Sequence, residues 1–373
     1  MNLYYTGICQ LLDGNKALKG EGYYVKTDDN RLLYTESAPL ETKVVTFQNL
    51  EDALFEGCKR IINNFSISKN NIDVYAFNLY ADEYNSFYVY MNTIAGLENT
   101  VKKHYPNYSD TQIQSLKYNQ GDFAFQFYPS DMGEVASTIE GFERMASDLS
   151  YEDEEAEEFL SDDVPVVAYE KKIFKDGHYL AALNVVKRLA KADAFSNLNK
   201  TEDFIYYAAT GHDYNDYSLV MRKTIDPELF YQCFPDLRVK DEEFKSILVQ
   251  QANNTVEESL DYWVEAFKSE FNKKSPYQYT KTEYDVFLSL ARYSRELAKE
   301  CVSRLHQKLG NGLEDNLDLD EIFIYVKALE FVVDNSDDEI INSCKLILET
   351  LDNESNEISA SISKDIKEIL NVA

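Results

Sequence analysis

The run IDVYAFNLYA, at residues 72–81, constrains the fold of this chain most. It is apolar or aromatic at both alternating sets of positions, whereas a strand with one solvated face alternates apolar and polar residues. Such a strand needs cover on both sides, which predicts a place near the middle of a sheet. The run DFIYYAAT, at residues 203–210, has the same character. We expect both runs in one sheet, and neither on an exposed edge.

Helical patterns surround these two strands. Thr46 precedes an apolar stripe at helical spacing, Thr93 can cap a second helix, and Ser109 with Gln112 forms a capping box for a third. Residues 132–149 and 179–195 carry further amphipathic patterns, while residues 1–45 favour short strands and turns, with a hairpin at residues 28–30. The predicted fold class is therefore α+β, with an α/β-like central sheet flanked by helices.

The pattern changes near residue 240. Glycine becomes nearly absent, strand signals stop, and apolar residues recur at helical spacing in four separate stretches up to residue 369. This pattern predicts an all-helical C-terminal region, either a bundle or a helical-repeat array. We therefore predict two domains, an α/β domain over residues 1–238 and a helical domain over residues 239–373.

Charge restricts the class of partner. The chain has 66 acidic and 37 basic residues, a net charge of −29, which would repel the phosphates of nucleic acids and an acidic membrane surface. The same field attracts basic proteins, although it could also serve solubility alone. No apolar run is long enough to span a membrane, the N-terminus lacks the pattern of a signal peptide, and the five cysteines contain no CxxC pair. We expect a cytoplasmic protein with reduced thiols.

Few residues point to chemistry. The four histidines have no metal-ligand spacing, and the chain lacks the glycine-rich phosphate-binding and nucleophile-elbow motifs. We therefore assign no catalytic residue, no cofactor and no metal.

The best candidate site follows the two predicted strands. Thr210, His212, Asp213 and Asp216 come after one strand, and Asp82 with Glu83 ends the other. Ligands of open α/β sheets gather at such strand ends, so the two groups would share one rim if the strands are neighbours. Alternatively, Asp213 or Asn215 caps the next helix and His212 is an ordinary loop residue.

Tyrosine is the other unusual feature, with 28 residues in the chain. Most of the aromatic residues in DVYAFNLYADEYNSFYVYMNTIAG (residues 73–96) are explained as sheet core and cross-strand pairs. Tyr84 and Tyr88 lie at or near the predicted turn, where a side chain can leave the core. They are therefore the candidate aromatic anchors for a partner protein.

Three segments carry a resemblance to a known family: LEDALFEGCKRI, DVYAFNLYADEYNSFYVYMNT and DFIYYAATGHDYNDYSLVMRKTIDPELF. In this order they resemble the bacterial domain-of-unknown-function family forty-three-oh-three, over about residues 46–235. The family pattern of aromatic and aliphatic strand residues is met by residues 76–80, and its late acidic-proline segment by residues 225–228. The chain differs in having no tryptophan before Trp263. The family is similar in size, acidity and aromatic content to immunity proteins of bacterial toxin systems, an analogy that implies no catalytic residues.

Three functions fit these observations. The first is a non-catalytic protein-binding module of the immunity or adaptor type, which uses an acidic, tyrosine-rich surface against a basic partner such as a toxin. The second is an enzyme of unspecified reaction, with its site at the sheet rim near Asp82 and His212. The third is a scaffold that acts through the C-terminal helices. The sequence favours the first, and it leaves the oligomeric state open.

Overall fold

The computed structural model describes residues 3–151, 157–211, 220–268, 283–309, 319–333, 336–353 and 356–370. The chain divides into two units, one formed by Gly7–Asp236 and the other by Met1–Thr6 with Leu237–Ala373. That residues 1–238 and 239–373 fold as separate domains stays a prediction. In the described ranges, no helix is both long enough and apolar enough to cross a membrane.

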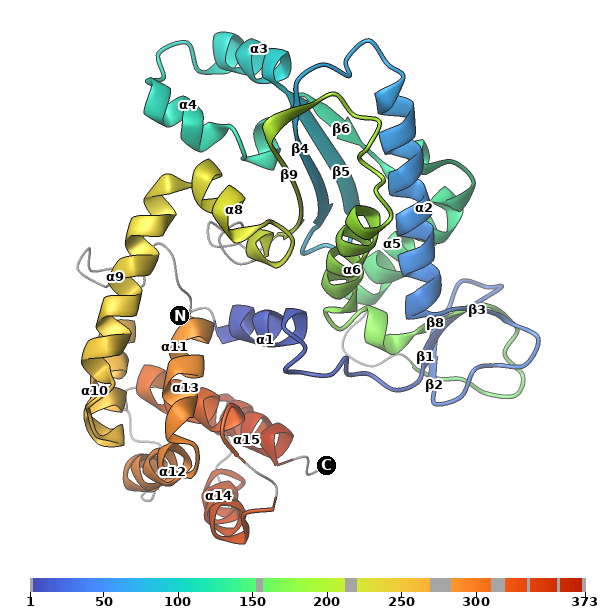
Figure 1. Ribbon diagram of the computed structural model, residues 1–373. Helices are drawn as coiled ribbons and strands as arrows, with labels where there is room; N and C mark the ends of the chain where they lie inside the picture. Colours follow the sequence, from blue (N-terminus) through green and yellow to red (C-terminus); the bar gives the residue numbers. More distant parts are fainter. Residues whose placement is uncertain are drawn as a thin grey trace. The chain divides into compact units, whose positions relative to one another are not determined.

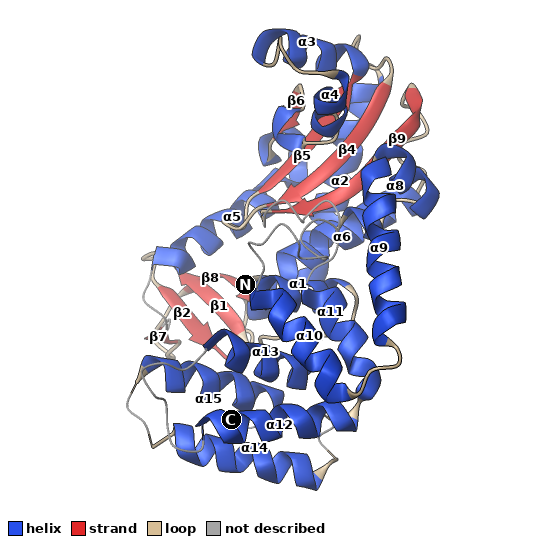
Figure 2. Cartoon of the chain, turned by 90° about the vertical axis from the view of Figure 1, so that its left-hand side faces the viewer, coloured by secondary structure: helices blue, strands red, loops and turns tan. Residues whose placement is uncertain are grey.

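The predicted strands lie side by side in a four-stranded sheet, here named sheet B (Figure 2). Its strand order is β6 (Phe125–Phe127), β5 (Phe87–Thr93), β4 (Val74–Ala81) and β9 (Lys200–Thr210). Strand β4 pairs antiparallel with β5 and parallel with β9, so the predicted interior position is confirmed for residues 74–81, whereas Ile72 lies before the strand and is exposed.

Helices lie against both faces of sheet B, fully on one face and only in part on the other (Figures 1 and 2), which accounts for its two-sided apolar strands. On one face, Phe77 of β4 packs against Phe195, just after helix α6 (Gly177–Lys191), with ring centroids 5.1 Å apart. On the other face, Tyr75 packs edge-on against Tyr118, at 5.7 Å, after helix α4 (Asp110–Leu116).

Strand β9 differs from the expectation in one respect, because it is an edge strand of sheet B. Its edge is not bare. The Thr224 hydroxyl, after the 3-10 turn η4 (Met221–Lys223), donates to the Tyr206 carbonyl at 3.1 Å, and helix α8 (Pro227–Cys233) also contacts the strand. A sequence pattern reports that a strand is covered, but not whether another strand or a helix covers it.

The predicted helix starts are confirmed by their caps. Thr46 and Asn49 form a reciprocal capping box at α2 (Phe47–Ser66), Thr93 accepts from Gly96 at α3 (Ile94–His104), and Ser109 with Gln112 caps α4. Helix α5 (Ala136–Tyr151) starts later than its pattern predicts. A 3-10 segment, η2 (Pro129–Val135), precedes it, and Gly133 has a φ of 74°, which interrupts the helix.

The N-terminal region corrects one expectation. Residues Leu3–Leu12 form helix α1 instead of strands and turns, since a short run that is apolar almost throughout shows no helical period. The predicted α+β fold class is confirmed, and a second sheet, here named sheet A, accompanies sheet B. Its order is β3 (Lys43–Val45), β8 (Pro165–Glu170), β1 (Tyr23–Thr27), β2 (Leu32–Thr35) and β7 (Glu157–Glu158). The predicted hairpin joins β1 and β2, with Asn30 at a φ of 65°.

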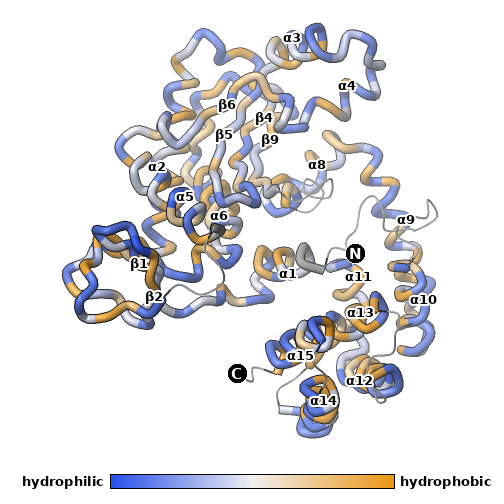
Figure 3. Tube along the Cα trace, turned by 180° about the vertical axis from the view of Figure 1, so that it is seen from behind, coloured by the Kyte–Doolittle hydropathy of each residue, from blue (hydrophilic) through white to orange (hydrophobic). Residues whose placement is uncertain are grey.

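The C-terminal region is helical in every described element, as predicted. Its helices share one buried core that includes the single tryptophan, Trp263. Hydrophobic and hydrophilic stretches alternate along these helices (Figure 3). The helices are α9 (Pro235–Gln251), α10 (Val256–Lys268), α11 (Glu283–Leu290), α12 (Arg295–Leu309), α13 (Leu319–Glu330), α14 (Asp338–Leu351) and α15 (Glu357–Ile369). Among the described residues, short 3-10 turns also occur at Gln120–Asp122 (η1), Lys171–Ile173 (η3) and Ala291–Tyr293 (η5).

Candidate functional site

The ends of three strands meet at one rim of sheet B. Ala81, the last residue of β4, pairs with Thr210 at the end of β9 and with Phe87 at the start of β5. The segments that follow β4 and β9 are in close contact, because a Cβ built on Gly211 would lie 2.7 Å from the Glu83 backbone nitrogen. The two candidate groups that follow these strands therefore begin at the same rim, as the sequence predicts for neighbouring strands.

Asp82 organises the turn at this rim. Its Oδ1 accepts hydrogen bonds from the Tyr84 and Ser86 backbone N–H groups, at 2.9 and 2.7 Å, and its own carbonyl oxygen lies 3.2 Å from Nε2 of the buried His178. Burial raises the pKa of Asp82, the two backbone hydrogen bonds oppose that rise, and the charge of Glu83 adds to it.

A second carboxylate, Glu143 of helix α5, lies beside the first. Glu143 Oε1 accepts the Phe87 backbone N–H at 2.8 Å, so consecutive amides, those of Ser86 and Phe87, hold the two carboxylates. Burial raises the pKa of Glu143 to about 7, against the Phe87 hydrogen bond and with help from the negative charge of Asp82. Within the described ranges, neither Asp82 nor Glu143 forms a salt bridge.

Four tyrosines cluster beside this carboxylate pair. Tyr80 lies directly across from Tyr88, and their ring centroids are 6.2 Å apart. Tyr90 is 6.1 Å from Tyr80, and Tyr128 is 5.8 Å from Tyr88. Tyr80, Tyr88 and Tyr90 are half-buried and Tyr128 is exposed, so the cluster keeps contact with solvent. Burial raises the pKa of Tyr90 to about 12, and its neighbours Tyr88, Tyr128 and Asp82 add to the rise.

Asn78 adds a hydrogen-bond acceptor on the tyrosine face. It is two residues before Tyr80 and directly across from Tyr90, so all three share one face of the sheet. Asn78 is fully buried, and its amide nitrogen donates to the Tyr207 carbonyl at 3.3 Å. Its Oδ1 accepts no hydrogen bond from the described residues. Asn78 therefore lies in the core below the tyrosines, and the rim itself combines carboxylate acceptors with aromatic faces, a combination suited to a cationic group.

Residues 50–225 match a family model described as Domain of unknown function (DUF4303). This segment is a DUF4303 domain. The match runs from helix α2 to the end of β9 and into the η4 region, so it includes every rim residue described above. It confirms the resemblance noted from the sequence, with slightly narrower limits than residues 46–235. Neither a curated protein nor a solved structure matches the chain significantly.

The DUF4303 domain brings together only part of the predicted site. Asp82 belongs to the carboxylate pair at the rim, and Tyr88 belongs to the group of four tyrosines beside it. Glu83 is exposed beside Gly211, and Tyr84 is 75% exposed on the turn. His212, Asp213 and Asp216 lie outside the described residues. In the ranges that the structure describes, no three metal-ligating side chains converge.

Sequence reasoning missed Glu143, and it also assigned no site role to Asn78, Tyr80, Tyr90 and Tyr128. Glu143 lies four residues after Ile139 and three before Ala146, both buried, so a charged residue occupies the apolar side of helix α5. This sequence pattern, an acidic residue within an apolar helical stripe, could have identified Glu143 as a candidate. Its partners, Phe87 and Asp82, could not have been identified in this way, because they belong to a distant strand and turn.

The raised pKa of Glu143 predicts how the stability of the DUF4303 domain depends on pH. Since Glu143 ionises near pH 7 when folded and near 4.5 when unfolded, the wild type loses stability as the pH rises through this window. The full shift corresponds to roughly 3 kcal/mol, which we reduce to about 1–2 kcal/mol because the side chain is partly exposed. We expect Glu143→Gln to be more stable than the wild type by this amount at pH 8, measured by urea denaturation.

The difference between Glu143→Gln and the wild type should become small near pH 4, where Glu143 is mostly protonated in both the folded and the unfolded state. Glu140→Gln is the matched control, because it removes one charge from the same helix and leaves the Phe87 hydrogen bond intact. If the two variants show the same dependence of stability on pH, the gain in stability comes from reduced charge repulsion in general and not from the buried surroundings of Glu143.

Proposed function

We propose that this protein is a non-catalytic protein-binding module of the immunity or adaptor type. In this proposal, the rim of sheet B receives a basic partner protein. The observation that carries the proposal is the pair Asp82 and Glu143, two partly desolvated carboxylates without a salt bridge among the described residues, beside four tyrosines with access to solvent.

A lysine or arginine side chain of the partner would complete this site chemically. Its charge would offset the repulsion between the two carboxylates, and the tyrosine rings would add cation–π attraction of about 0.5–2 kcal/mol. Tyrosine also provides a large, rigid contact surface that keeps one hydrogen-bonding group. The net charge of −29 would accelerate the encounter with a basic protein. A toxin with a basic catalytic cleft is one partner of this kind, and the cytoplasm is the compartment that we propose for the complex.

Salt dependence tests the electrostatic part of this proposal. We expect the association rate with a basic partner, recovered from the native cells at low salt, to fall about tenfold or more between roughly 50 and 500 mM salt. The dissociation rate should change little, because desolvated tyrosine contacts would hold the complex. Surface plasmon resonance at several salt concentrations separates the two rates. An association rate independent of salt would contradict the proposal and leave the acidity as a solubility device.

Tyr84 tests the aromatic part. Its side chain is exposed on the turn, so Tyr84→Ala should leave the fold unchanged while weakening partner binding by about 1–3 kcal/mol. Tyr108→Ala is the matched control, because Tyr108 is also exposed, at 39%, but lies between α3 and α4 and not at the rim. Equal losses from the two variants would show that the partner does not bind at the rim.

The rim also supports a second candidate function, an enzyme. Glu143, with a pKa of about 7 beside a second carboxylate, has the proton affinity that a general acid or base needs near neutral pH. For an enzyme, Glu143→Gln would abolish turnover at every pH, whereas a binding module would keep its partner with only a modest change in affinity. A metabolic operon around the gene would favour the enzyme, and a neighbouring toxin gene the binding module.

A further inference from the structure

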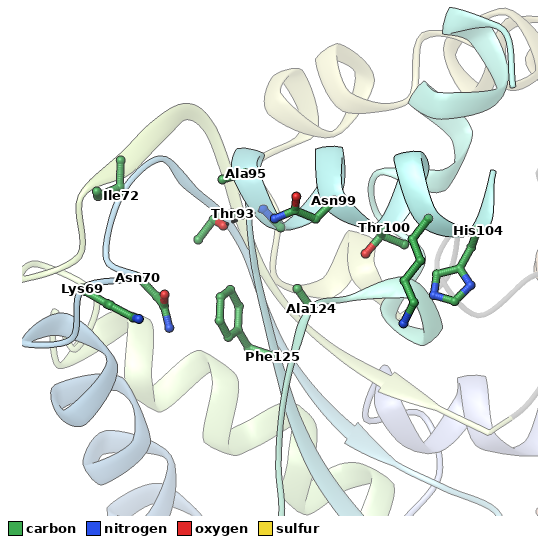
Figure 4. A pocket seen from close by; sticks show the side chains of 12 residues that line it. Lys69, Asn70, Ile72, Thr93, Ala95, Asn99, Thr100, His104, Ala124 and Phe125 are labelled. Carbon is green, nitrogen blue, oxygen red and sulfur yellow. Dashed lines mark hydrogen bonds between the residues drawn. The ribbon is translucent and has the colours of Figure 1, made fainter. Parts of the chain in front are cut away.

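A cavity lies at the end of sheet B opposite to the rim. It has a volume of about 610 Å³ and lies between helix α3 and the segments that lead into β4 and β6 (Figure 4). This volume is within the usual range for small-molecule sites, about 300–1,000 Å³.

The charge of this cavity is opposite to that of the chain. Its lining contains Lys69, Lys103 and His104 but no aspartate or glutamate, although acidic residues outnumber basic ones 66 to 37 in the whole chain. In the described ranges, neither lysine takes part in a salt bridge. A concave wall of one charge concentrates ions of the opposite charge, so this cavity would attract anions despite the net charge of the protein.

The basic residues come from separate parts of the chain. Lys103 and His104 lie in the last turn of α3, where basic residues commonly favour the helix dipole and need no ligand. Lys69 has no such explanation, because it belongs to the loop between α2 and β4. Figure 4 shows Lys69 on one side of the cavity and His104 on the other, with the Phe125 ring between them.

Hydrogen-bond donors and an aromatic surface complete the lining. Asn70 and Asn99 contribute amide groups along the same cavity, whereas the Thr100 hydroxyl already donates to the Asp122 carbonyl at 3.4 Å. The first turn of α3, at residues 95–96, also lines the cavity, but the Gly96 N–H already donates to the Thr93 hydroxyl. The basic side chains Lys69 and His104 lie on opposite sides of the cavity, so the lining fits an anion with more than one charged group.

We propose that this cavity binds a small polyanion with two or more linked phosphate groups, either free or as part of a nucleotide. Lys69 and Lys103 would neutralise the phosphates, and Phe125 would offer a surface for a nucleobase if one is present. This second site is independent of the protein partner proposed for the rim.

Isothermal titration calorimetry of the full chain with tripolyphosphate, ATP and adenosine tests this proposal. We expect saturable binding of tripolyphosphate and ATP and none of adenosine. Tighter binding of ATP than of tripolyphosphate would assign a nucleotide, and equal affinities would assign the free phosphate chain. Absence of binding by both phosphate compounds would overturn the proposal.

Matched lysine variants locate the site. Lys69→Gln and Lys103→Gln should each weaken binding of tripolyphosphate about tenfold, whereas Lys102→Gln should change it less than twofold. Lys102 is the control because it is exposed, adjacent in the same helix and equal in charge, but it does not line the cavity. Equal losses from Lys102→Gln and Lys103→Gln would overturn the assignment to this cavity. All three lysines are exposed, so an unchanged thermal midpoint is expected for each variant.

Discussion

Phe77→Ala should destabilise the DUF4303 domain by roughly 3–5 kcal/mol. Phe77 is fully buried in β4, between Met91 of β5 and Tyr206 of β9, and its ring packs against Phe195. Removing the ring leaves a cavity that the paired strands cannot close, because their hydrogen bonds hold the backbone in place. Phe77→Leu is the matched control, and it should cost about 1–1.5 kcal/mol because it keeps most of the apolar volume.

The same variant tests whether the two units fold separately. Trp263 is the only tryptophan and is buried in the core of the helical unit, so tryptophan fluorescence reports on that unit alone. Near-ultraviolet circular dichroism of the tyrosines follows mainly the sheet-containing unit. For separate domains, Phe77→Ala should shift the tyrosine transition in urea and leave the fluorescence transition unchanged. If both transitions shift together, the domain prediction for residues 1–238 and 239–373 is wrong.

Lys117→Met should cost about 2–4 kcal/mol at pH 7, because it removes one member of a largely buried ion pair. Lys117 pairs with Asp203 of β9, and its ammonium group lies 5.1 and 5.2 Å from the ring centroids of Tyr75 and Tyr118. The Tyr118 hydroxyl donates to the same carboxylate at 2.9 Å. Without the lysine, Asp203 would remain partly buried and charged with only hydroxyl partners.

The pH dependence of this loss follows from Asp203. Burial favours its neutral form, but hydrogen bonds, first that from Lys117, outweigh burial and hold the pKa of Asp203 below its usual value. The stability that Asp203 contributes in the wild type is therefore present above its unfolded pKa, near 3.8, and is lost as the pH falls through the folded value. In Lys117→Met the carboxyl protonates more readily, so the difference from the wild type should shrink toward pH 4.

Two further variants distinguish the stability effect of this buried ion pair from that of an exposed surface pair. The double variant Lys117→Met with Asp203→Leu should recover most of the lost stability, because it leaves no unpaired charge. Lys59→Met breaks an exposed pair with Glu56 and should cost less than about 1 kcal/mol. A double variant no more stable than Lys117→Met alone would show that packing, and not charge, dominates at this position.

The candidate site was only partly predictable from the sequence. Asp82, Glu83, Tyr84 and Tyr88 lie next to a strand end that the apolar pattern locates, and their contacts with one another are local. Tyr128 and Glu143 contribute to the same rim from other segments. Their positions depend on how strand β6 and helix α5 pack on the sheet, and a single sequence contains no measure of that packing. The basic cavity was missed for the same reason, because Lys69 and Lys103 come to line one cavity only after α3 packs near β5 and the segment that leads into β4.

What the sequence determined by itself was local or compositional. Thr46, Thr93 and Ser109 begin their helices through hydrogen bonds that span three residues, so four consecutive letters suffice to predict them. The two-sided apolar strands predicted their own burial, and the excess of acidic residues predicted the net charge without any fold. Tertiary structure alone decided that β9 is a covered edge strand, that residues 3–12 are helical, and that a second sheet exists. It also decided that Glu143 lies beside Asp82. Such contacts depend on how distant segments pack, and many packing arrangements are compatible with the local sequence. The arrangement that forms is the one that buries the apolar surface of the whole domain best.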